Sequence, residues 1–439
     1  MCWLRASLPT ICFSTRQRLG VRRVSGITTP DRYTIRFRLT TNTAPYFIGS
    51  LVLPVTAPVP ADYARRFDAQ SPSTYNQHVV ATGPYMVRND ASGRAVGYQP
   101  GTSIDLVRNP SWSAKTDTRP AYLDHVQIRT NATDSTIAAR QVLAGRGLAL
   151  NQPPPATIIK RIAEDRGAVS VRLNTGGYRF VPINTTIKPF DDINVRRAVL
   201  AVFDRDATRL ARGGASTGPL ATHFLGPGIP GFADTGGFKG PGFDYLRAPK
   251  GDPVLAAQYM RKAGYASGKY SGEQSFLLVS GNDEADRGIA EVAQAQFGKL
   301  GFRTRLKLVS PDTLFTNWCA TPAKRVLACA SSILWLKDFV DPEPMLRPVF
   351  NGDAIAPNNN TNYSQLDDPK INRAMDAATS LTGTARAKAW AVIDRMIVAD
   401  APAIPIQWEI ATLIHSKDVA GVANLYFDSW DLSYTGLRG

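Results

Sequence analysis

The stretch Val181–Arg205, VPINTTIKPFDDINVRRAVLAVFDR, decides the fold class of this chain. A short extended run reaches Pro189, and the acidic pair Asp191-Asp192 follows it. Carboxylates cap the free N–H groups of a helix and suit the positive end of its dipole, so a helix is predicted to begin here. One face of that helix is apolar, formed by Val195, Ala198, Val199 and Val202, with Arg196, Arg197 and Arg205 off it.

Strands and helices alternate on either side of this unit. Residues 275–280, 303–309 and 403–408 are predicted strands, and residues 284–299, 311–318 and 384–399 are predicted helices. Two further helices are predicted to begin at Asp134 and at Asp252, and Gly264 is placed to end the second. The stretch 172–405 therefore indicates an α/β fold. Inside it, the Gly- and Pro-rich residues 213–251 show no periodicity and are predicted to form a surface loop.

The length of 439 residues exceeds what one hydrophobic core usually serves, so more than one domain is expected. No apolar run approaches the roughly 18–20 residues that a membrane-spanning helix needs. Near the start, Arg32–Leu39 alternates strictly between apolar and polar residues, which predicts a half-buried strand.

The net charge is +15, and eight arginines against one aspartate place +7 of it in residues 1–40. Two interpretations are open: a basic arm for nucleic acid or anionic lipid, or an Arg-rich composition without a role in binding. No aromatic-interleaved basic stripe recurs later, which favours the second. Arg, Pro or Thr interrupts each apolar run in the first 23 residues, so the sequence shows no secretory signal.

Two of the four cysteines bracket a short loop, CATPAKRVLAC, between Cys319 and Cys329. A disulfide there suits an exported protein, and two free buried thiols are the alternative. The four histidines are scattered singly, so no metal site is predicted. Nucleophile-elbow, zinc-protease and phosphate-loop motifs are missing as well, so no catalytic residue and no cofactor is predicted.

The best candidate for a ligand site is Leu334–Leu346, LWLKDFVDPEPML. Asp338 and Asp341 follow a predicted strand, and the ends of strands in α/β sheets are where ligands usually bind. Three interpretations stay open: turn and capping chemistry, a cation site, or a carboxylate that pairs with a ligand ammonium group. Phe339 and Tyr363 lie in predicted loops and, with Trp335, are the aromatic candidates to contact a ligand.

Several segments, in order along the chain, resemble the extracellular solute-binding proteins of family 5, the oligopeptide, dipeptide and nickel receptors of ABC importers. They are Thr82–Tyr85, Leu106–Pro110 with Trp112, Pro120–Asp124, Val181–Arg205, Asp252–Tyr265 and Asp400–Trp408. In peptide-binding members, a Trp-x-x-Asp-x-x-(Asp/Glu/Asn)-Pro segment supplies an aspartate that pairs with the peptide α-amino group. Trp335, Asp338, Asp341 and Pro342 match that layout, which implies that Asp338 is the aspartate that pairs with the ammonium group. Asn362-Tyr363 resembles a segment that follows the binding loop in relatives.

The resemblance implies a two-lobed α/β fold of the periplasmic-binding-protein type (type II, cluster C-like). It divides the chain into a basic leader over 1–25, part of lobe I with a remnant of an accessory domain over 26–171, lobe II over 172–408, and a return to lobe I over 409–439. Family members usually carry an export signal and an opening strand before the strand matched by Asp31–Leu39. That leading portion has no counterpart here, so part of one lobe is expected to be missing.

The predicted function is capture of a short peptide between the lobes, at Asp338, Trp335, Phe339, Asp341, Asn362 and Tyr363, without catalysis. The implied partners are an ABC permease and its ATPase, and the implied location is the periplasm or the cell surface, as a monomer. A remnant without ligand, a binder of a nickel complex or a sugar, and a basic nucleic-acid-binding protein are the alternatives. A partner nucleic acid is not expected.

Overall fold

The computed structural model describes residues 26–132, 134–151, 154–164, 170–421, 423–424 and 429–438, so the predicted leader over 1–25 lies outside the described residues. The chain forms two compact units. Unit 1 contains residues 54–175 and 410–439, and unit 2 contains residues 26–53 and 176–409. The sequence had grouped residues 26–53 with the segment that follows them; the structure places them in unit 2 instead.

Unit 1 is built around a small antiparallel sheet in which β3 and β4 both pair with β5, as does β6. Its elements are α2 (Ala61–Asp68), β3 (Tyr85–Val87), β4 (Tyr98–Gln99), β5 (Ser103–Arg108), β6 (His125–Arg129), α3 (Ser135–Ala144), β7 (Ala149–Leu150), α4 (Ala156–Glu164), β14 (Val419–Ala420), β15 (Ala423–Asn424), β16 (Ser429–Trp430) and β17 (Gly436–Leu437). The predicted cap of α3 is present, because the Asp134 carboxylate accepts from the N–H groups of Thr136 and Ile137.

Two long strands carry the chain between the units: β8 (Ser170–Pro182) and β13 (Ala403–His415). In unit 2, β12 (Ile333–Trp335) pairs antiparallel with β8, with Trp335 opposite Tyr178. The sequence predicted a strand over 403–408 and a strand-like tail over 410–432, and the structure joins the start of that tail to the strand, since β13 continues to His415 and pairs there with β7.

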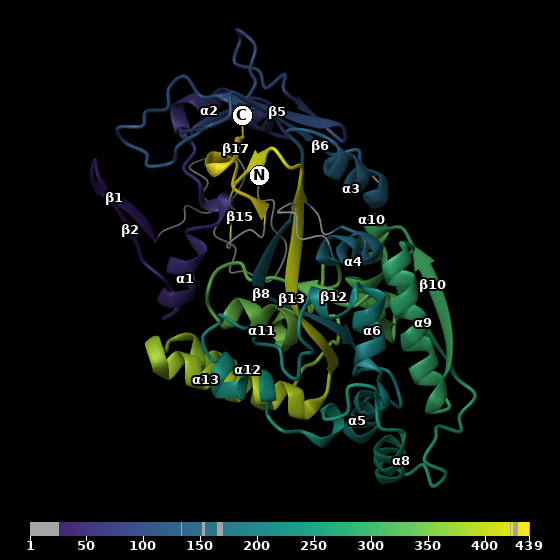
Figure 1. Ribbon diagram of the computed structural model, residues 1–439. Coiled ribbons are helices and arrows are strands. Elements are labelled where there is room, and N and C mark those ends of the chain that lie inside the picture. Colours follow the sequence, from purple (N-terminus) through teal and green to yellow (C-terminus); the bar gives the residue numbers. More distant parts are fainter. Residues whose placement is uncertain are drawn as a thin grey trace. The chain divides into compact units, whose positions relative to one another are not determined.

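Unit 2 also holds the predicted α/β alternation. Strands β10 (Arg303–Val309) and β11 (Ala328–Cys329) flank β9 (Ser275–Gly281), and both pair with it in parallel. Helix α9 (Glu284–Lys299) lies along this sheet (Figure 1). The remaining elements of unit 2 are β1 (Ile27–Asp31), β2 (Thr34–Phe37), α1 (Ala44–Ser50), α5 (Ile193–Val202), α6 (Arg205–Ala211), α7 (Phe232–Thr235), α8 (Pro253–Lys262), α10 (Pro311–Thr313), α11 (Glu343–Phe350), α12 (Pro369–Thr379) and α13 (Gly383–Asp400).

The helix predicted after the Pro-Phe-Asp-Asp break is present but divided in two. Asp192 caps α5 by accepting from the N–H of Asn194, and Asp204 caps α6 by accepting from the N–H of Ala207. All four predicted apolar residues of α5 are buried. The arginines predicted off that face are not all on the surface: Arg196 is buried and donates to Asp400 (2.7 Å), and Arg205 is buried and donates to two backbone carbonyl groups.

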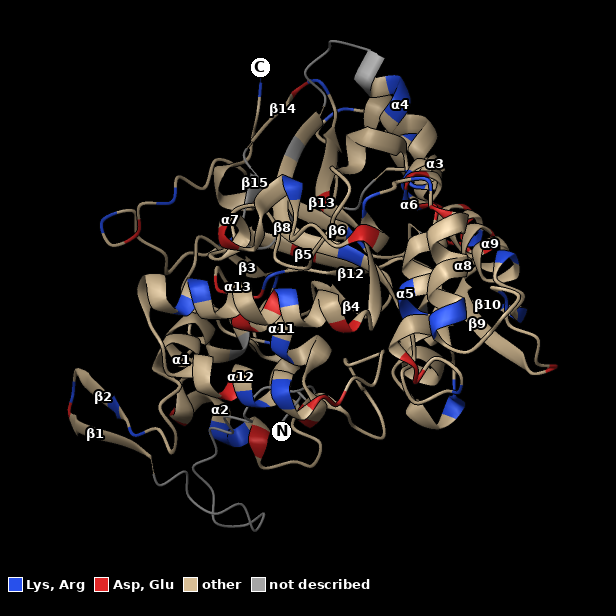
Figure 2. Cartoon of the chain, turned by 90° about the horizontal axis from the view of Figure 1, so that it is seen from below, with Lys and Arg blue, Asp and Glu red and all other residues tan. Residues whose placement is uncertain are grey.

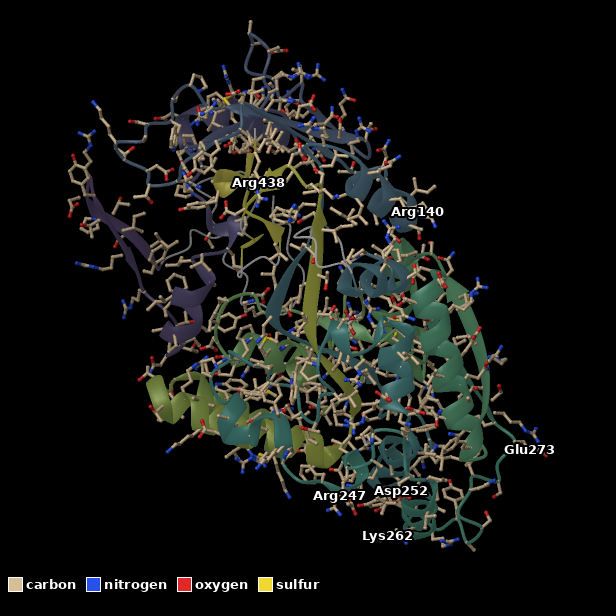
Figure 3. All side chains as sticks on the ribbon, viewed as in Figure 1. Arg140, Arg247, Asp252, Lys262, Glu273 and Arg438 are labelled. Carbon is tan, nitrogen blue, oxygen red and sulfur yellow. A yellow bond between two sulfur atoms is a disulfide. The ribbon has the colours of Figure 1, made fainter. Side chains whose placement is uncertain are left out.

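Helix α8 follows its predicted limits. Asp252 caps it by accepting from the N–H of Leu255, and the chain leaves it through Gly264, whose φ of +94° suits glycine. Figure 3 labels Asp252 and Lys262, which mark the two ends of this helix. Helices α5 and α8 pack against the main core of unit 2, which includes Phe190, Val199 and Met260.

The predicted half-buried strand near the N-terminus is a hairpin of β1 and β2 whose apolar side is uncovered. Tyr33 is 87% exposed and Ile35 is 61% exposed. The prediction of burial was therefore wrong for Tyr33 and Ile35, because a two-stranded hairpin has no buried face unless another layer covers it. The Phe47 ring of α1 packs against Phe37, with 5.0 Å between the ring centroids. Among the described residues, none of the helices is long and apolar enough to cross a membrane.

Candidate functional site

Asp338 lies in the turn between β12 and α11, as the strand-end prediction requires. Its side chain is half-buried, and burial raises the pKa of its carboxyl group above the ordinary aspartate value. No described side chain or backbone N–H donates to this carboxylate, and no described cation forms a salt bridge with it. A partly desolvated carboxylate without a counter-charge is unfavourable, and a ligand ammonium group would relieve that cost.

Phe339, the next residue, is turned into the protein. It is only 4% exposed, and its ring meets Tyr46 of α1 edge-on at 5.3 Å between centroids. The contact with α1 is so close that a Cβ atom at Gly49 would overlap the Phe339 ring. Phe339 therefore packs α1 against the loop between β12 and α11, and it offers a ligand little surface.

The phenol of Tyr46, on α1, is close enough to the carboxylates of the loop after β12 for their charge to affect its pKa. Its pKa is raised, first by burial and then by the negative charge of Asp338, with Glu343 and Asp341 adding to it. Its phenol therefore stays protonated at neutral pH. Sequence analysis did not select Tyr46, because it lies almost 300 positions before Asp338 and in no motif shared with it.

Asp341 is occupied by structural contacts. The guanidinium of Arg386 on α13 donates to both of its oxygens at 2.8 Å, and the N–H of Glu343 donates to it at 2.9 Å. The same guanidinium also donates to Glu343 at 2.6 Å and to the Thr379 carbonyl at 2.9 Å. The structure thus places Asp341 in the capping role, the first of the three interpretations open for this loop.

Trp335 ends β12 and is half-buried. Its indole N–H donates to the carbonyl of Pro344 at 2.9 Å, and this hydrogen bond joins the two ends of the loop between β12 and α11. Because the N–H is engaged, what the indole can offer a ligand is its apolar face.

Asn362 is fully buried and organises its own turn: its amide donates to the carbonyls of Asn351 and Leu366 at 3.0 and 2.8 Å. Tyr363 lies 5.8 Å from the Phe315 ring, and burial raises the pKa of its phenol to about 12. Tyr363 thus reaches the region around residues 315–329, where Cys319 and Cys329 form a disulfide. Tyr363 and both cysteines line one narrow crevice there.

The structure therefore does not bring all six predicted site residues together. Trp335, Asp338, Phe339 and Asp341 lie between the end of β12 and the start of α11. Asn362 bonds its own turn and Asn351 at the end of α11, and Tyr363 lines the crevice beside the disulfide. Of the six, only Asp338 presents an unpaired charge. The residue that sequence reasoning missed is Arg386, which lies 45 positions beyond Asp341 in a predicted helix and carries no local signal for its role.

A surface cavity of about 560 Å³ lies at the start of α5 and the end of α8. Asp191, Asp192, Tyr265 and Tyr270 are among the residues that line it, and it contains none of the predicted site residues. In the described ranges, no group of three or more His, Cys, Asp or Glu side chains is placed to hold a metal ion.

Buried charge also gathers where β9 ends and α9 begins. Burial, reinforced by Asp283, raises the pKa of Asp286 to about 7, and Arg212 lies 3.9 Å away. Burial also lowers the pKa of Arg212 to about 10. Because the folded protein holds the Asp286 proton at pH values where the unfolded chain has lost it, Asp286 favours folding at low pH, and that contribution disappears as pH rises towards 7.

Asp286→Asn is therefore expected to flatten the dependence of the unfolding free energy on pH between about 4 and 8, with a difference on the order of 2–4 kcal/mol. Urea titrations at several pH values measure it. Glu291→Gln, an exposed change on the same helix, is the control and should leave the pH dependence unchanged. Parallel curves for Asp286→Asn and the wild type would show that the Asp286 carboxyl titrates normally.

A family model described as bacterial extracellular solute-binding proteins, family 5 Middle, matches residues 8–357. The dipeptide-binding protein of Pseudomonas aeruginosa is 23% identical over 398 residues, which are 89% of this chain and 68% of that protein. Across the curated relatives that it matches, the chain spans between 59% and 68% of their length.

Solved structures show the same likeness in three dimensions. The clavulanic acid biosynthesis oligopeptide binding protein 2 has a TM-score of 0.78 and 26% identity, over 95% of this chain and 73% of that one. The periplasmic binding protein DppA from Helicobacter pylori, in complex with the peptide STSA, has a TM-score of 0.74 and 19% identity, over 94% of this chain and 74% of that one. The fold is that of the type II periplasmic binding proteins, and the chain belongs to the bacterial extracellular solute-binding proteins of family 5, a family of receptors and not of enzymes.

Proposed function

We propose that this chain is the substrate-binding component of an ABC importer and that it captures a short peptide whose terminal ammonium group pairs with Asp338. The observation that carries the proposal is the carboxylate itself: it is half-buried, its pKa is raised by burial, and it has no described partner. Its neighbour Asp341 has two acidic oxygens as well, but Arg386 occupies both.

The comparisons support a peptide as the ligand class. One relative is named a dipeptide-binding protein, and one solved neighbour holds the peptide STSA. A peptide N-terminus is a compact ammonium group, which a single half-buried carboxylate can pair with at short range. In this proposal the receptor works as a monomer outside the cytoplasmic membrane and hands its ligand to a permease with its ATPase.

The test is calorimetric titration of the wild-type chain with di-, tri- and tetrapeptides, each in a free and an N-acetylated form. N-acetylation removes the positive charge and keeps every side chain, so affinity is expected to fall by at least about 30-fold. Equal binding of both forms would exclude the ammonium pairing. Binding of nickel complexes or sugars, with no binding of any peptide, would favour the non-peptide alternative.

A further inference from the structure

An exposed basic surface lies at the edge of the parallel sheet of unit 2. Five exposed cations form it: Arg303, Arg305, Lys307, Lys324 and Arg325, here called the basic edge. Among the described residues none of the five forms a salt bridge. Figure 2 draws Lys and Arg in blue, and blue segments can be followed on β10.

Strand geometry arranges three of these cations in a row. Arg303, Arg305 and Lys307 occupy alternate positions of β10, and alternate residues of a strand point to the same face, roughly 6.6 Å apart. Trp318 extends the surface, because the Nζ atoms of Lys307 and Lys324 lie 4.6 and 5.4 Å from its ring centroid. The two segments, β10 and the disulfide-closed loop, therefore form one surface.

β10 is also the outer strand of its sheet. The strand order is β10-β9-β11, and no described strand pairs with the other side of β10 (Figure 1). One β10 carbonyl, that of Thr304, accepts from the side chain of Gln294 at 3.2 Å. An outer strand with backbone groups open to solvent accepts another extended chain readily, unless its side chains prevent it.

The charges select which chain can add. A second copy of β10 would place cations opposite cations, which is unfavourable, so the row opposes self-association. In an extended segment with Asp or Glu at alternate positions, the carboxylates share one face and have the same spacing as Arg303, Arg305 and Lys307. Each carboxylate can therefore lie beside one cation. Lipid head groups or nucleic-acid phosphates would match the charges but not the open backbone groups.

We propose that the basic edge is a docking surface for an acidic, extended polypeptide segment of a partner protein, which adds to β10 as a further strand. The segment carries Asp or Glu at alternate positions, facing Arg303, Arg305 and Lys307. This surface does not rest on peptide capture at Asp338: the ligand there is recognised by its ammonium group, and the partner here by its carboxylates.

The experiment uses fluorescence anisotropy of the full chain with a labelled probe, a nine-residue peptide that alternates Glu with Thr. Two matched probes accompany it: one alternates Lys with Thr, and one keeps the Glu residues but has alternate backbone nitrogens methylated. The N-terminus of every probe is acetylated, so that none presents an ammonium group to Asp338. Vesicles with anionic lipid are a separate arm.

The acidic probe is expected to bind, and the Lys probe is expected not to. N-methylation should weaken binding at least tenfold, because it removes the backbone donors that strand addition needs. Raising the salt from 0.05 to 0.5 M should weaken binding strongly, because screening acts on exposed charges. The variant Arg303→Glu/Arg305→Glu/Lys307→Glu should lose the acidic probe and gain the Lys probe.

The control variant is Arg247→Glu/Lys250→Glu/Arg261→Glu, which changes the net charge equally at exposed positions of the same unit (Arg247 is labelled in Figure 3). It should bind the acidic probe like the wild type. If both variants lost affinity for the acidic probe equally, net charge alone would explain the binding and the proposal would be overturned. Equal binding of the methylated probe, or binding of vesicles without the acidic probe, would overturn it too. Unchanged melting temperatures confirm that both variants fold.

Discussion

Replacing Asp338 by Asn is expected to lower the affinity for peptides with a free N-terminus by about 30- to 1,000-fold. The change keeps the shape of the side chain and removes only its charge, so an ammonium group would be buried without a counter-charge. Calorimetry with the tightest-binding peptide measures the loss. Asp353→Asn, an exposed aspartate of the same unit, is the matched control and should bind like the wild type.

The dependence on pH gives a second measure of the same group. Burial raises the pKa of Asp338 in the free protein, and a bound ammonium favours the ionised form. Peptide affinity should therefore begin to fall, as the pH is lowered, at a higher pH than an ordinary aspartate would give. In Asp338→Asn that part of the pH dependence should be missing.

Stability should change in the opposite direction from affinity. The pKa of Asp338 is raised in the folded state, so its protonated carboxyl group favours folding below the pKa of the unfolded chain. That contribution is lost as the pH rises through the pKa of the folded protein, because the ionised carboxylate is then partly desolvated. At neutral pH the ligand-free Asp338→Asn protein should thus melt a few degrees higher than the wild type. A variant that binds normally, or that melts lower without ligand, would contradict the role assigned to Asp338.

The parts of the fold that the sequence predicted are those that local chemistry determines. Asp134, Asp192 and Asp252 each begin a helix where predicted, because a carboxylate that caps a helix acts within three residues of itself. The strands and helices of the parallel sheet follow from periodicity in the same way. The division between α5 and α6 was missed, although Asp204 carries the same capping signal inside an apparently continuous pattern.

The missed parts depend on contacts between distant residues. Phe339 was predicted to face a ligand, and α1, almost 300 positions earlier in the chain, contacts it through Tyr46. Arg196 lies off the apolar face of its helix in the sequence and is nevertheless buried, because Asp400 lies beside it in the fold. No pattern in the surrounding residues distinguishes such an arginine from one exposed to solvent.

The binding loop shows the same limit. The motif selected both Asp338 and Asp341, and the family resemblance assigned the pairing with an ammonium group to Asp338. Arg386 separates their roles, since it binds one carboxylate from a helix of the same unit and leaves the other unpaired. The candidate aspartates were thus predictable from the loop, but the arginine that occupies Asp341 was not.

The Arg386 network leads to the largest expected loss of stability. Arg386 is 5% exposed in its side chain, and its guanidinium bonds Asp341 (14% exposed) and Glu343 (4% exposed). Burial raises the pKa of Glu343, and Arg386 offsets part of that rise. Arg386→Met keeps much of the side-chain volume but leaves both carboxylates partly desolvated without a cation, so the unfolding free energy should fall by about 3–5 kcal/mol.

Chemical denaturation monitored by tryptophan fluorescence measures this loss. Lys388→Met, an exposed change two residues later on the same helix, should alter stability by less than about 0.5 kcal/mol. The triple variant Arg386→Met/Asp341→Asn/Glu343→Gln removes the unpaired charges and should recover part of the loss, because the cost of the single change arises from isolated carboxylates. If the triple variant were less stable than Arg386→Met, lost packing and hydrogen bonds, and not unpaired charge, would be the cause. If Arg386→Met were as stable as the wild type, the network would not hold the binding loop.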